Sequence, residues 1–416
     1  MNRYYDVASF EDQEIHTVRA RHRYVWQFGL SLMGIGILVA IFALSPLGTA
    51  PARRKVSPTA AGTLLFWGVI DKGKTCAYAV GANGRDMRCL WPNPIAGDAL
   101  RDYRCGEALM SPNGRTVLLS LYYRNTLGDK APPTNNQLLL MSADGTQART
   151  LWQSDRPIAD LTFSRDSRQI AFSLDGVAPS IVVLPVDGDT TLSAARRLGA
   201  GLIKPQQPAF SHDGAAIVFV AGYPNSRSLY TIDINGSDIH CLAHNIPGAS
   251  NPTFGPDDRT LIFRRRNPTS ASFETLNLAT GALQNMKAYD PALQTQLSSS
   301  IMESQGECSN NDGRSAIFAV RHTEPDLMGV ADVWYARPDG THLRRLLCGS
   351  APPAPLHDAY FQRLAYSADG SRIACVGGDI FGDSGLCIVG TSGTGAASYI
   401  PLPVGGMDVK GISFGA

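Results

Sequence analysis

Short apolar runs separated by polar turns recur along the chain from residue 62 onward. The clearest turns follow the phrase Ser-x-Asp/Asn-Gly, and an apolar run typical of a buried strand comes after each. These copies are Ser111–Gly114, Ser211–Gly214 and Ser367–Gly370, and looser ones are Ser164–Ser167, Gly255–Asp258 and Ser309–Gly313. A phrase that returns at intervals of about forty to sixty residues predicts a solenoid, propeller or array.

Each repeat can be interpreted as four antiparallel strands. The Ser-x-Asp-Gly turn joins the first strand to the second, and an Asp-Gly or Asn-Gly turn joins the third to the fourth, because such turns need residues that tolerate positive φ. The predicted second strands are Leu64–Trp67, Thr116–Ser120, Gln169–Ser173, Ala216–Val220, Thr260–Arg264, Ser315–Val320 and Arg372–Val376.

The two ends of the repeat region complement each other. Leu64–Trp67 has no first strand before it, and Lys410–Gly415 resembles a first strand with no second strand after it. Pairing these segments would close a ring and remove exposed sheet edges. The expected fold class is therefore an all-β, seven-bladed β-propeller closed by a C-terminal strand, with six or eight blades as alternatives.

Composition supports an all-β body and limits the partners. The chain has 41 glycines and 26 prolines, as many tight turns require, and only 18% charged residues. Lys and Arg number 37 against 36 Asp and Glu, so the net charge provides no field for nucleic acid. We expect no nucleic-acid partner.

One uncharged, largely apolar segment precedes the repeats. Residues 25–47 are long enough for a transmembrane helix, which needs about 20 residues. The rival interpretation is a cleaved signal peptide, but its apolar core would be shorter and would start nearer the N-terminus. The expected organisation is a cytoplasmic head at 1–24, one membrane-spanning helix at 25–47, a linker at 48–61 and the propeller at 62–416. Gly29, Gly36 and Ala40 are small residues that would let this helix pack against another.

The repeat resembles the TolB-type β-propeller, a WD-like family. The resemblance lies in the strand, Ser-x-Asp-Gly, strand phrase and in later turns such as Asp144–Thr146, and it covers nearly all of 62–416. It identifies a repeat class, and it implies a rigid platform for binding proteins. TolB itself is periplasmic and has a separate N-terminal domain for which this chain has no room, so its particular function does not carry over.

Long connections mark one face of the predicted ring. They join second to third strands, or fourth to first strands of the next repeat, and we predict that they form the partner surface. Neutral variation in tolerated surface loops is the alternative. The candidate partner residues in these connections are Arg124, Asp129, Arg265, Arg266, His322, Asp326, Asp379 and Asp383.

Eight cysteines are the reactive groups that the sequence offers. Cys76 and Cys89 flank a predicted hairpin turn, and Cys375 and Cys387 flank another connection. Directly opposed strand positions approach disulfide distance, so both pairs are candidate disulfides, which would favour an oxidising compartment. Buried free thiols are the alternative.

No catalytic, cofactor-binding or metal-binding set emerges from the remaining residues. Gly382–Gly385 carries a protease-like Gly-Asp-Ser-Gly phrase, but no histidine partner is placed and a turn is the simpler interpretation. Asp379 and Asp383 do not have the spacing of a calcium loop.

The expected function follows from the anchor and the platform. We expect a non-enzymatic accessory subunit in a bacterial inner membrane, with a cytoplasmic N-terminus and a periplasmic propeller that binds and stabilises the protein subunits of a larger membrane complex. An enzyme with its site at the mouth of the propeller channel is one alternative, and a ligand sensor is the other.

Overall fold

The structure is a computed structural model of the whole chain. It describes residues 62–70, 74–92, 103–123, 135–187, 195–255, 257–267, 270–285, 308–309, 316–321, 330–336, 344–379, 383–393, 396–403 and 407–415. All of them belong to the second of two units into which the chain divides, Lys55–Ala416. The expected head, membrane helix and linker, including Gly29, Gly36 and Ala40, lie outside these residues. Within the described ranges we find no helix with the length and apolarity needed for a membrane span.

The described strands pair into seven four-stranded antiparallel sheets. The first three contain, in pairing order, β28 (Asp408–Gly415), β1 (Thr63–Ile70), β2 (Lys74–Gly81) and β3 (Arg88–Trp91); β4 (Tyr103–Met110), β5 (Thr116–Tyr123), β6 (Asn136–Ser142) and β7 (Arg149–Ser154); and β8 (Ile158–Phe163), β9 (Gln169–Leu174), β10 (Ser180–Pro185) and β11 (Arg196–Leu198).

The fourth and fifth sheets contain β12 (Gln206–Phe210), β13 (Ala216–Ala221), β14 (Ser228–Asp233) and β15 (His240–Ala243); and β16 (Ala249–Phe254), β17 (Thr260–Asn267), β18 (Ser270–Asn277) and β19 (Leu283–Asn285). The sixth and seventh contain β20 (Cys308–Ser309), β21 (Ala316–Arg321), β22 (Ala331–Ala336) and β23 (Arg344–Leu347); and β24 (Tyr360–Tyr366), β25 (Arg372–Gly378), β26 (Ser384–Gly390) and β27 (Ser398–Pro401). One 3-10 turn, η4 (Pro224–Ser226), lies between β13 and β14.

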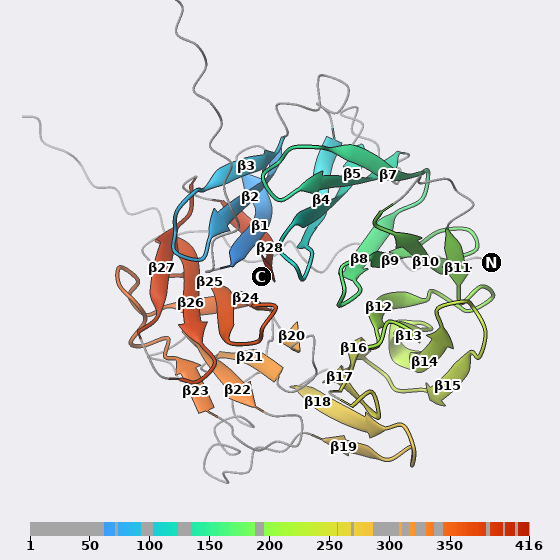
Figure 1. Cartoon of the computed structure of the whole chain (residues 1–416). Helices are drawn as coiled ribbons and strands as arrows, with labels where there is room; N and C mark the ends of the chain where they lie inside the picture. Colours follow the sequence, from blue (N-terminus) through green and yellow to red (C-terminus); the bar gives the residue numbers. More distant parts are fainter. Residues whose placement is uncertain are drawn as a thin grey trace, which may run out of the picture. The chain divides into compact units, whose positions relative to one another are not determined.

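The first strand of each repeat lies innermost in its sheet, and these inner strands face a common centre (Figure 1). The pairing predicted for the C-terminal segment is confirmed, because β28 runs antiparallel to β1 with Leu65 opposite Ser413. Gly411 lies opposite Trp67, whose ring occupies the place of a side chain at that glycine. The all-β propeller class is therefore confirmed, while the number of blades stays a prediction.

The Ser-x-Asp-Gly phrase forms a tight turn that is held by hydrogen bonds of its own side chains. In its first clear copy the Ser111 hydroxyl donates to Oδ1 of Asn113 (2.8 Å) and accepts the Thr116 amide (3.0 Å), while Gly114 adopts a positive φ of 67°. The same contacts recur at Ser211 and Ser367. These serines are almost fully buried, and the hydrogen bonds of the turn satisfy their hydroxyl groups.

The core lies between neighbouring sheets. The second and third strands supply it with alternating or continuous apolar runs, as in β5, β9 and β13, whose central residues are fully buried. Apolar clusters join the sheets in succession from the sixth, through the seventh and the first, to the fifth. This packing holds the inner strands side by side around the centre, where the candidate site lies.

Candidate functional site

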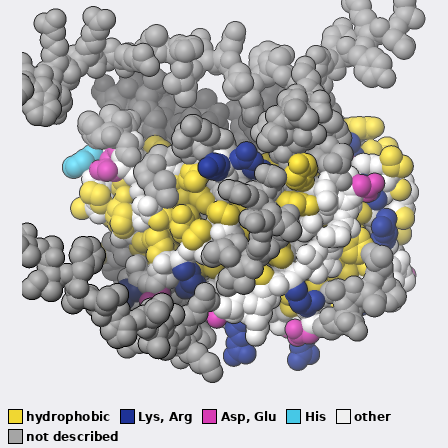
Figure 2. Space-filling model, turned by 90° about the horizontal axis from the view of Figure 1, so that it is seen from above, with side chains coloured by type: hydrophobic (Ala, Val, Ile, Leu, Met, Phe, Trp, Pro, Cys, Tyr) yellow, Lys and Arg dark blue, Asp and Glu magenta, His cyan; other side chains and the backbone are white. Residues whose placement is uncertain are grey.

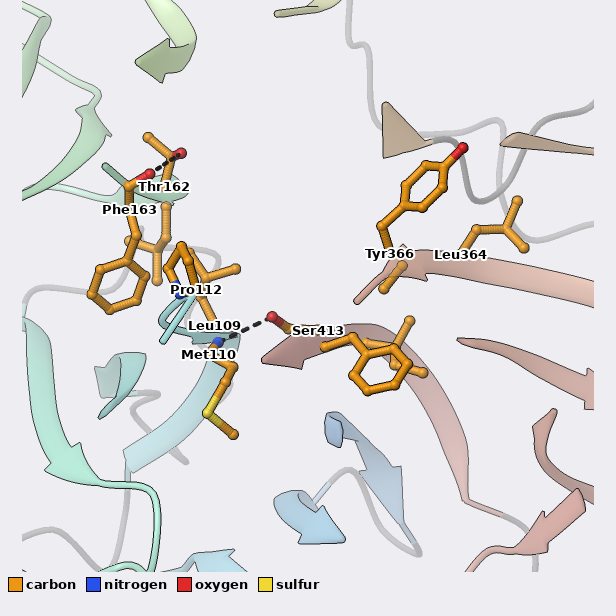
Figure 3. Close-up of a pocket in the computed structure, with 12 residues that line it drawn as sticks. Leu109, Met110, Pro112, Thr162, Phe163, Leu364, Tyr366 and Ser413 are labelled. Carbon is orange, nitrogen blue, oxygen red and sulfur yellow. Dashed lines mark hydrogen bonds between the residues drawn. The ribbon is translucent and has the colours of Figure 1, made fainter. Parts of the chain in front are cut away.

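A cavity of about 210 Å³ lies between the ends of four inner strands, β4, β8, β24 and β28. Figure 3 shows Phe163 and Tyr366 on opposite sides of it. Most of the side chains that line it are apolar, although polar atoms form about as much of its surface as apolar ones. Within it the Met110 amide donates to the Ser413 hydroxyl (3.1 Å). We call this the turn-end cavity, because its residues lie next to turns of the repeat phrase or near the C-terminal end of β28; it is lined by Leu109, Met110, Pro112, Leu161, Thr162, Phe163, Leu364, Ala365, Tyr366, Ile412, Ser413 and Phe414.

A second feature, the polar band, consists of Glu107, Asp160 and Gln207, which lie on the inner strands before the cavity residues. The Glu107 carboxylate accepts the Leu161 amide of the next sheet (3.2 Å to Oε2), and Asp160 Oδ2 accepts the Gln207 amide (3.0 Å). Gln207 Oε1 in turn accepts the Asn251 amide (2.9 Å). Each side chain of the band therefore ties its own sheet to the following one.

β-Bulges make these contacts possible. The inner strands shift register at the band, for example between Ala159 and Thr162 and between Gln206 and Ala209. Asp160, Gln207 and Asn251 sit there at φ values of 54°, 57° and 49°, a region that L-residues adopt at a cost of about 1–2 kcal/mol. A bulge leaves amide groups unpaired within its own sheet, and the neighbouring side chain accepts them.

Glu107 is the most perturbed carboxyl of the band. Its pKa is raised to about 8, chiefly by burial and secondly by the nearby Asp160 carboxylate, while hydrogen bonds from the Leu161 and Asp160 amides act in the opposite direction. A carboxyl poised near neutral pH can hold or release a proton there. Among the described residues, no three His, Cys, Asp or Glu side chains converge as a metal site.

The looser copies of the turn phrase turn out to bridge sheets. Ser167 stands where the clear copies have glycine, and its hydroxyl accepts the Asn113 amide of the preceding sheet (3.1 Å). Asp258 holds the same place in another copy, accepts the His212 amide and lies 2.7 Å from His212 Nδ1. Sequence analysis identified these segments only as looser copies of the phrase, although a side chain in place of glycine was the available signal.

The structure describes only some of the predicted partner residues. Arg124, Asp129, His322 and Asp326 lie outside the described residues, as does the side chain of Arg266.

Two of the connections that were predicted to be long are short in the structure. Arg265 and Arg266 belong to β17, which pairs with β18 as far as Asn267 opposite Ser270, and the Arg265 guanidinium lies 3.3 Å from the buried carboxylate of Glu274. The polar run there continues the strand because its side chains alternate onto the sheet surface.

The connection that holds Asp379 and Asp383 is also short, since β25 extends to Gly378 and β26 begins at Ser384. The buried Asp379 carboxylate accepts the amides of His357 (3.1 Å) and Asp383 (3.0 Å). Asp379 thus closes its own loop and anchors a neighbouring connection, as buried carboxylates with amide partners commonly do.

Large apolar side chains are exposed mainly on the predicted partner face. Val177, Tyr223 and Ile203 are 89%, 57% and 54% exposed, and they lie in the β9–β10, β13–β14 and β11–β12 connections. The Gly222 amide donates to the Ile203 carbonyl (2.6 Å), which places Ile203 beside the connection that carries Tyr223. Figure 2 looks at the side of the ring, at 90° to the view in Figure 1, and basic and acidic side chains of the described residues are interspersed there.

The two cysteine pairs differ from each other. Cys89 lies opposite Tyr78 because the β2–β3 register shifts and Asp86 adopts a positive φ of 58°, so the predicted opposition of Cys76 and Cys89 is wrong. Cys375 does lie opposite Cys387, and both are buried free thiols in the structure. Burial raises the pKa of Cys375 well above its ordinary value.

The repeated four-stranded sheets around one centre define a β-propeller. No protein-family model and no curated protein sequence matches the chain. Among solved structures, a puromycin-hydrolysing peptidase from Mycobacterium tuberculosis is similar with a TM-score of 0.57 and 15% identity, over 84% of this chain and 53% of that one. Oligogalacturonate lyase from Vibrio parahaemolyticus is similar with a TM-score of 0.54 and 14% identity, over 83% and 88% of the two chains.

TolB from Acinetobacter baumannii is also similar, with a TM-score of 0.49 and 15% identity over 86% of this chain and 81% of that one. Identities this low show the fold alone. The β-propeller fold predicted from the repeat phrase is confirmed at that level by the two structures with TM-scores of 0.57 and 0.54. The chain spans about half the length of the puromycin-hydrolysing peptidase.

Proposed function

We propose that this protein is a membrane-anchored accessory subunit whose seven sheets are the blades of one closed propeller. The segment 25–47 is its membrane helix, the N-terminus is cytoplasmic, and the propeller is periplasmic. The propeller binds another protein through the face that carries the β9–β10, β11–β12 and β13–β14 connections, and it stabilises the complex to which that protein belongs.

The exposed apolar side chains of these connections carry the proposal. Val177, Ile203 and Tyr223 are large apolar groups left in water by a fold that buries such groups elsewhere, and exposed apolar clusters on soluble surfaces commonly mark binding sites. Aromatic side chains such as Tyr223 are enriched where interfaces concentrate their binding energy. The polar band and the bridging turns support the same proposal, because they make the scaffold beneath these connections rigid.

Affinity purification from native membranes in mild detergent, followed by mass spectrometry, tests the proposal. We expect the tagged protein to recover a defined set of membrane proteins in stoichiometric amounts. The double variant Ile203→Ser with Tyr223→Ser should lose this set while keeping its yield and melting temperature. A reporter at the C-terminus that is active only outside the cytoplasm tests the topology separately.

A matched control exists on the opposite side of the sheets. Ile239 and Leu283 are each 45% exposed, and they follow the turns that join third to fourth strands. The double variant Ile239→Ser with Leu283→Ser removes a similar apolar area and should keep the partners. Equal loss in both double variants, or recovery of the wild-type protein alone, would contradict the proposed face.

An enzyme acting in the central channel is the second candidate. The observation that favours it is the position of Glu107, a carboxyl with a pKa of about 8, next to Asp160 on the inner strands that also form the turn-end cavity. The fold is shared with a puromycin-hydrolysing peptidase and a lyase, which likewise permits an enzyme. Hydrolysis of aminoacyl amides that Glu107→Gln abolishes, with the fold intact, would favour this candidate over the subunit.

A further inference from the structure

Two hairpins far apart in the sequence carry the same outer-strand arrangement. In the first sheet Tyr78 of β2 lies opposite Cys89 of β3, and in the fourth sheet Tyr230 of β14 lies opposite Cys241 of β15. Each tyrosine ring stacks on a phenylalanine of the second strand, with ring centroids 5.6 Å apart in the first sheet and 5.7 Å apart in the fourth. Both hairpins turn at an Asn-Gly followed two residues later by an aspartate with positive φ.

The two thiols also share their immediate surroundings. Each takes part in a hydrogen bond with the opposing tyrosine, and each has a backbone hydrogen bond with the residue two positions later, Trp91 or Ala243. Burial raises the pKa of Cys89 and of Cys241 above the ordinary value. The hydrogen bonds with the tyrosine and the backbone lower the pKa of each thiol, but burial outweighs them in both hairpins.

One residue distinguishes the two hairpins. Nδ1 of His244 lies 3.2 Å from Sγ of Cys241, whereas Pro92 holds the corresponding place, three residues after Cys89. An imidazole within hydrogen-bond reach of a thiol is the arrangement that activates nucleophilic cysteines, because it can take the thiol proton. A thiol whose pKa is raised depends on such a base more than an ordinary one does.

We propose that Cys241 is a site of covalent thiol modification, in which His244 acts as the base and a low-molecular-weight disulfide is the co-reactant. The Cys241 S–H bond breaks and its proton passes to Nδ1 of His244. The thiolate attacks one sulfur of the disulfide, so that a new S–S bond forms to Cys241 while the old S–S bond breaks. The leaving thiolate takes the proton back from the His244 imidazolium, and no external oxidant is needed.

Exposure alone predicts the opposite order of reactivity. Cys89 is exposed, whereas Cys241 is only partly so, and access to the reagent would favour Cys89. The two cysteines thus form an internal comparison in which the tyrosine, the backbone contact and the hairpin are matched, and the histidine differs. A faster Cys241 cannot be explained by access.

The test is time-resolved labelling of the full-length protein with oxidised glutathione, with each modified cysteine identified by peptide mass spectrometry. We expect Cys241 to react faster than Cys89, and His244→Gln to slow Cys241 by at least about tenfold, as loss of a positioned base typically does. Cys89 should react at the same rate in both proteins.

His240→Gln is the matched control, because His240 is exposed, adjacent to Cys241 and on the opposite face of β15. It should leave the rate of Cys241 unchanged. Faster labelling of Cys89 than of Cys241, or equal effects of His244→Gln and His240→Gln, would overturn the proposal. His244→Asn repeats the test with a smaller side chain, and circular dichroism checks that each variant is folded.

Discussion

The inner strands β4 and β8 have different chemistry along their length, because each carries a residue of the polar band and, after it, residues of the turn-end cavity. The polar band holds carboxyl and amide groups that accept amides of the next sheet, whereas the turn-end cavity a few residues later is lined mostly by apolar side chains. The bulges separate the two regions, because an inserted residue changes which side chains point toward the neighbouring sheet. Directional hydrogen bonds therefore fix the spacing of the sheets at one end, and apolar packing fills the other end.

Phe163→Ala is expected to have the largest effect, at the cavity end. Phe163 is nearly buried and packs against the core between the second and third sheets. Removing its ring enlarges a cavity that the closed ring cannot collapse, so we expect a loss of about 3–5 kcal/mol in the free energy of unfolding. Chemical denaturation measures it, and Phe163→Leu should lose clearly less.

Asp160→Ala tests the polar band with a smaller expected effect. It removes Oδ2 of Asp160, which accepts both the Gln207 amide and the Ser173 hydroxyl (2.7 Å). The Gln207 amide is left with the Ser173 hydroxyl oxygen, at 3.2 Å, as its acceptor. We expect a loss of about 1–3 kcal/mol by denaturation, as for other unsatisfied buried donors. Asp160→Asn keeps an acceptor and tolerates the positive φ, so a similar loss in both variants would contradict this role of the carboxylate.

Glu107→Gln should change how steeply the stability of the protein depends on pH. The folded pKa of Glu107, about 8, lies above the ordinary 4.5, so the folded state binds more protons between these pH values and its stability falls as pH rises. The glutamine keeps an acceptor for the Leu161 amide but does not titrate. Melting temperatures across this window should therefore fall less steeply with pH in the variant, and parallel curves would contradict the assignment.

Ser167→Ala should have the smallest effect. It leaves the Asn113 amide without its hydroxyl acceptor at an edge of the ring and keeps the positive φ of 63°. We expect a loss of about 1 kcal/mol, the usual contribution of one such hydrogen bond. Ser167→Gly loses the same bond but relieves the backbone strain, so it should be the more stable of the two variants.

The repeat could be predicted from the sequence because its turns are local. The phrase from Ser211 to Gly214 is held by contacts between residues two to five apart in the sequence. The same residue types therefore recur in each clear copy. Ring closure was also predictable, because Lys410–Gly415 lacked one neighbour and Leu64–Trp67 lacked the other. Both inferences depend on the number and pattern of strands and on no particular side-chain contact.

The candidate site could not be predicted in the same way. Glu107 meets Leu161, and Asp160 meets Gln207, across about fifty residues, and nothing in their local sequence marks them. The register error at Cys76 has a similar origin, since one left-handed residue at Asp86 and a bulge moved the partner of Cys89 to Tyr78. A shift of two residues keeps each side chain on the same face of the sheet, so hydrophobic alternation does not reveal it.

The sequence by itself determined the class of fold, the position of its turns and the strand that closes it, because these depend on periodic burial and on residues that permit tight turns. Only the tertiary structure decided which side chains reach the neighbouring sheet, where the bulges separate polar contacts from the cavity, and that His244 lies against Cys241 while Cys89 has no such base. These features arise between segments that the sequence keeps apart, and distances of a few ångströms between them follow from packing rather than from pattern.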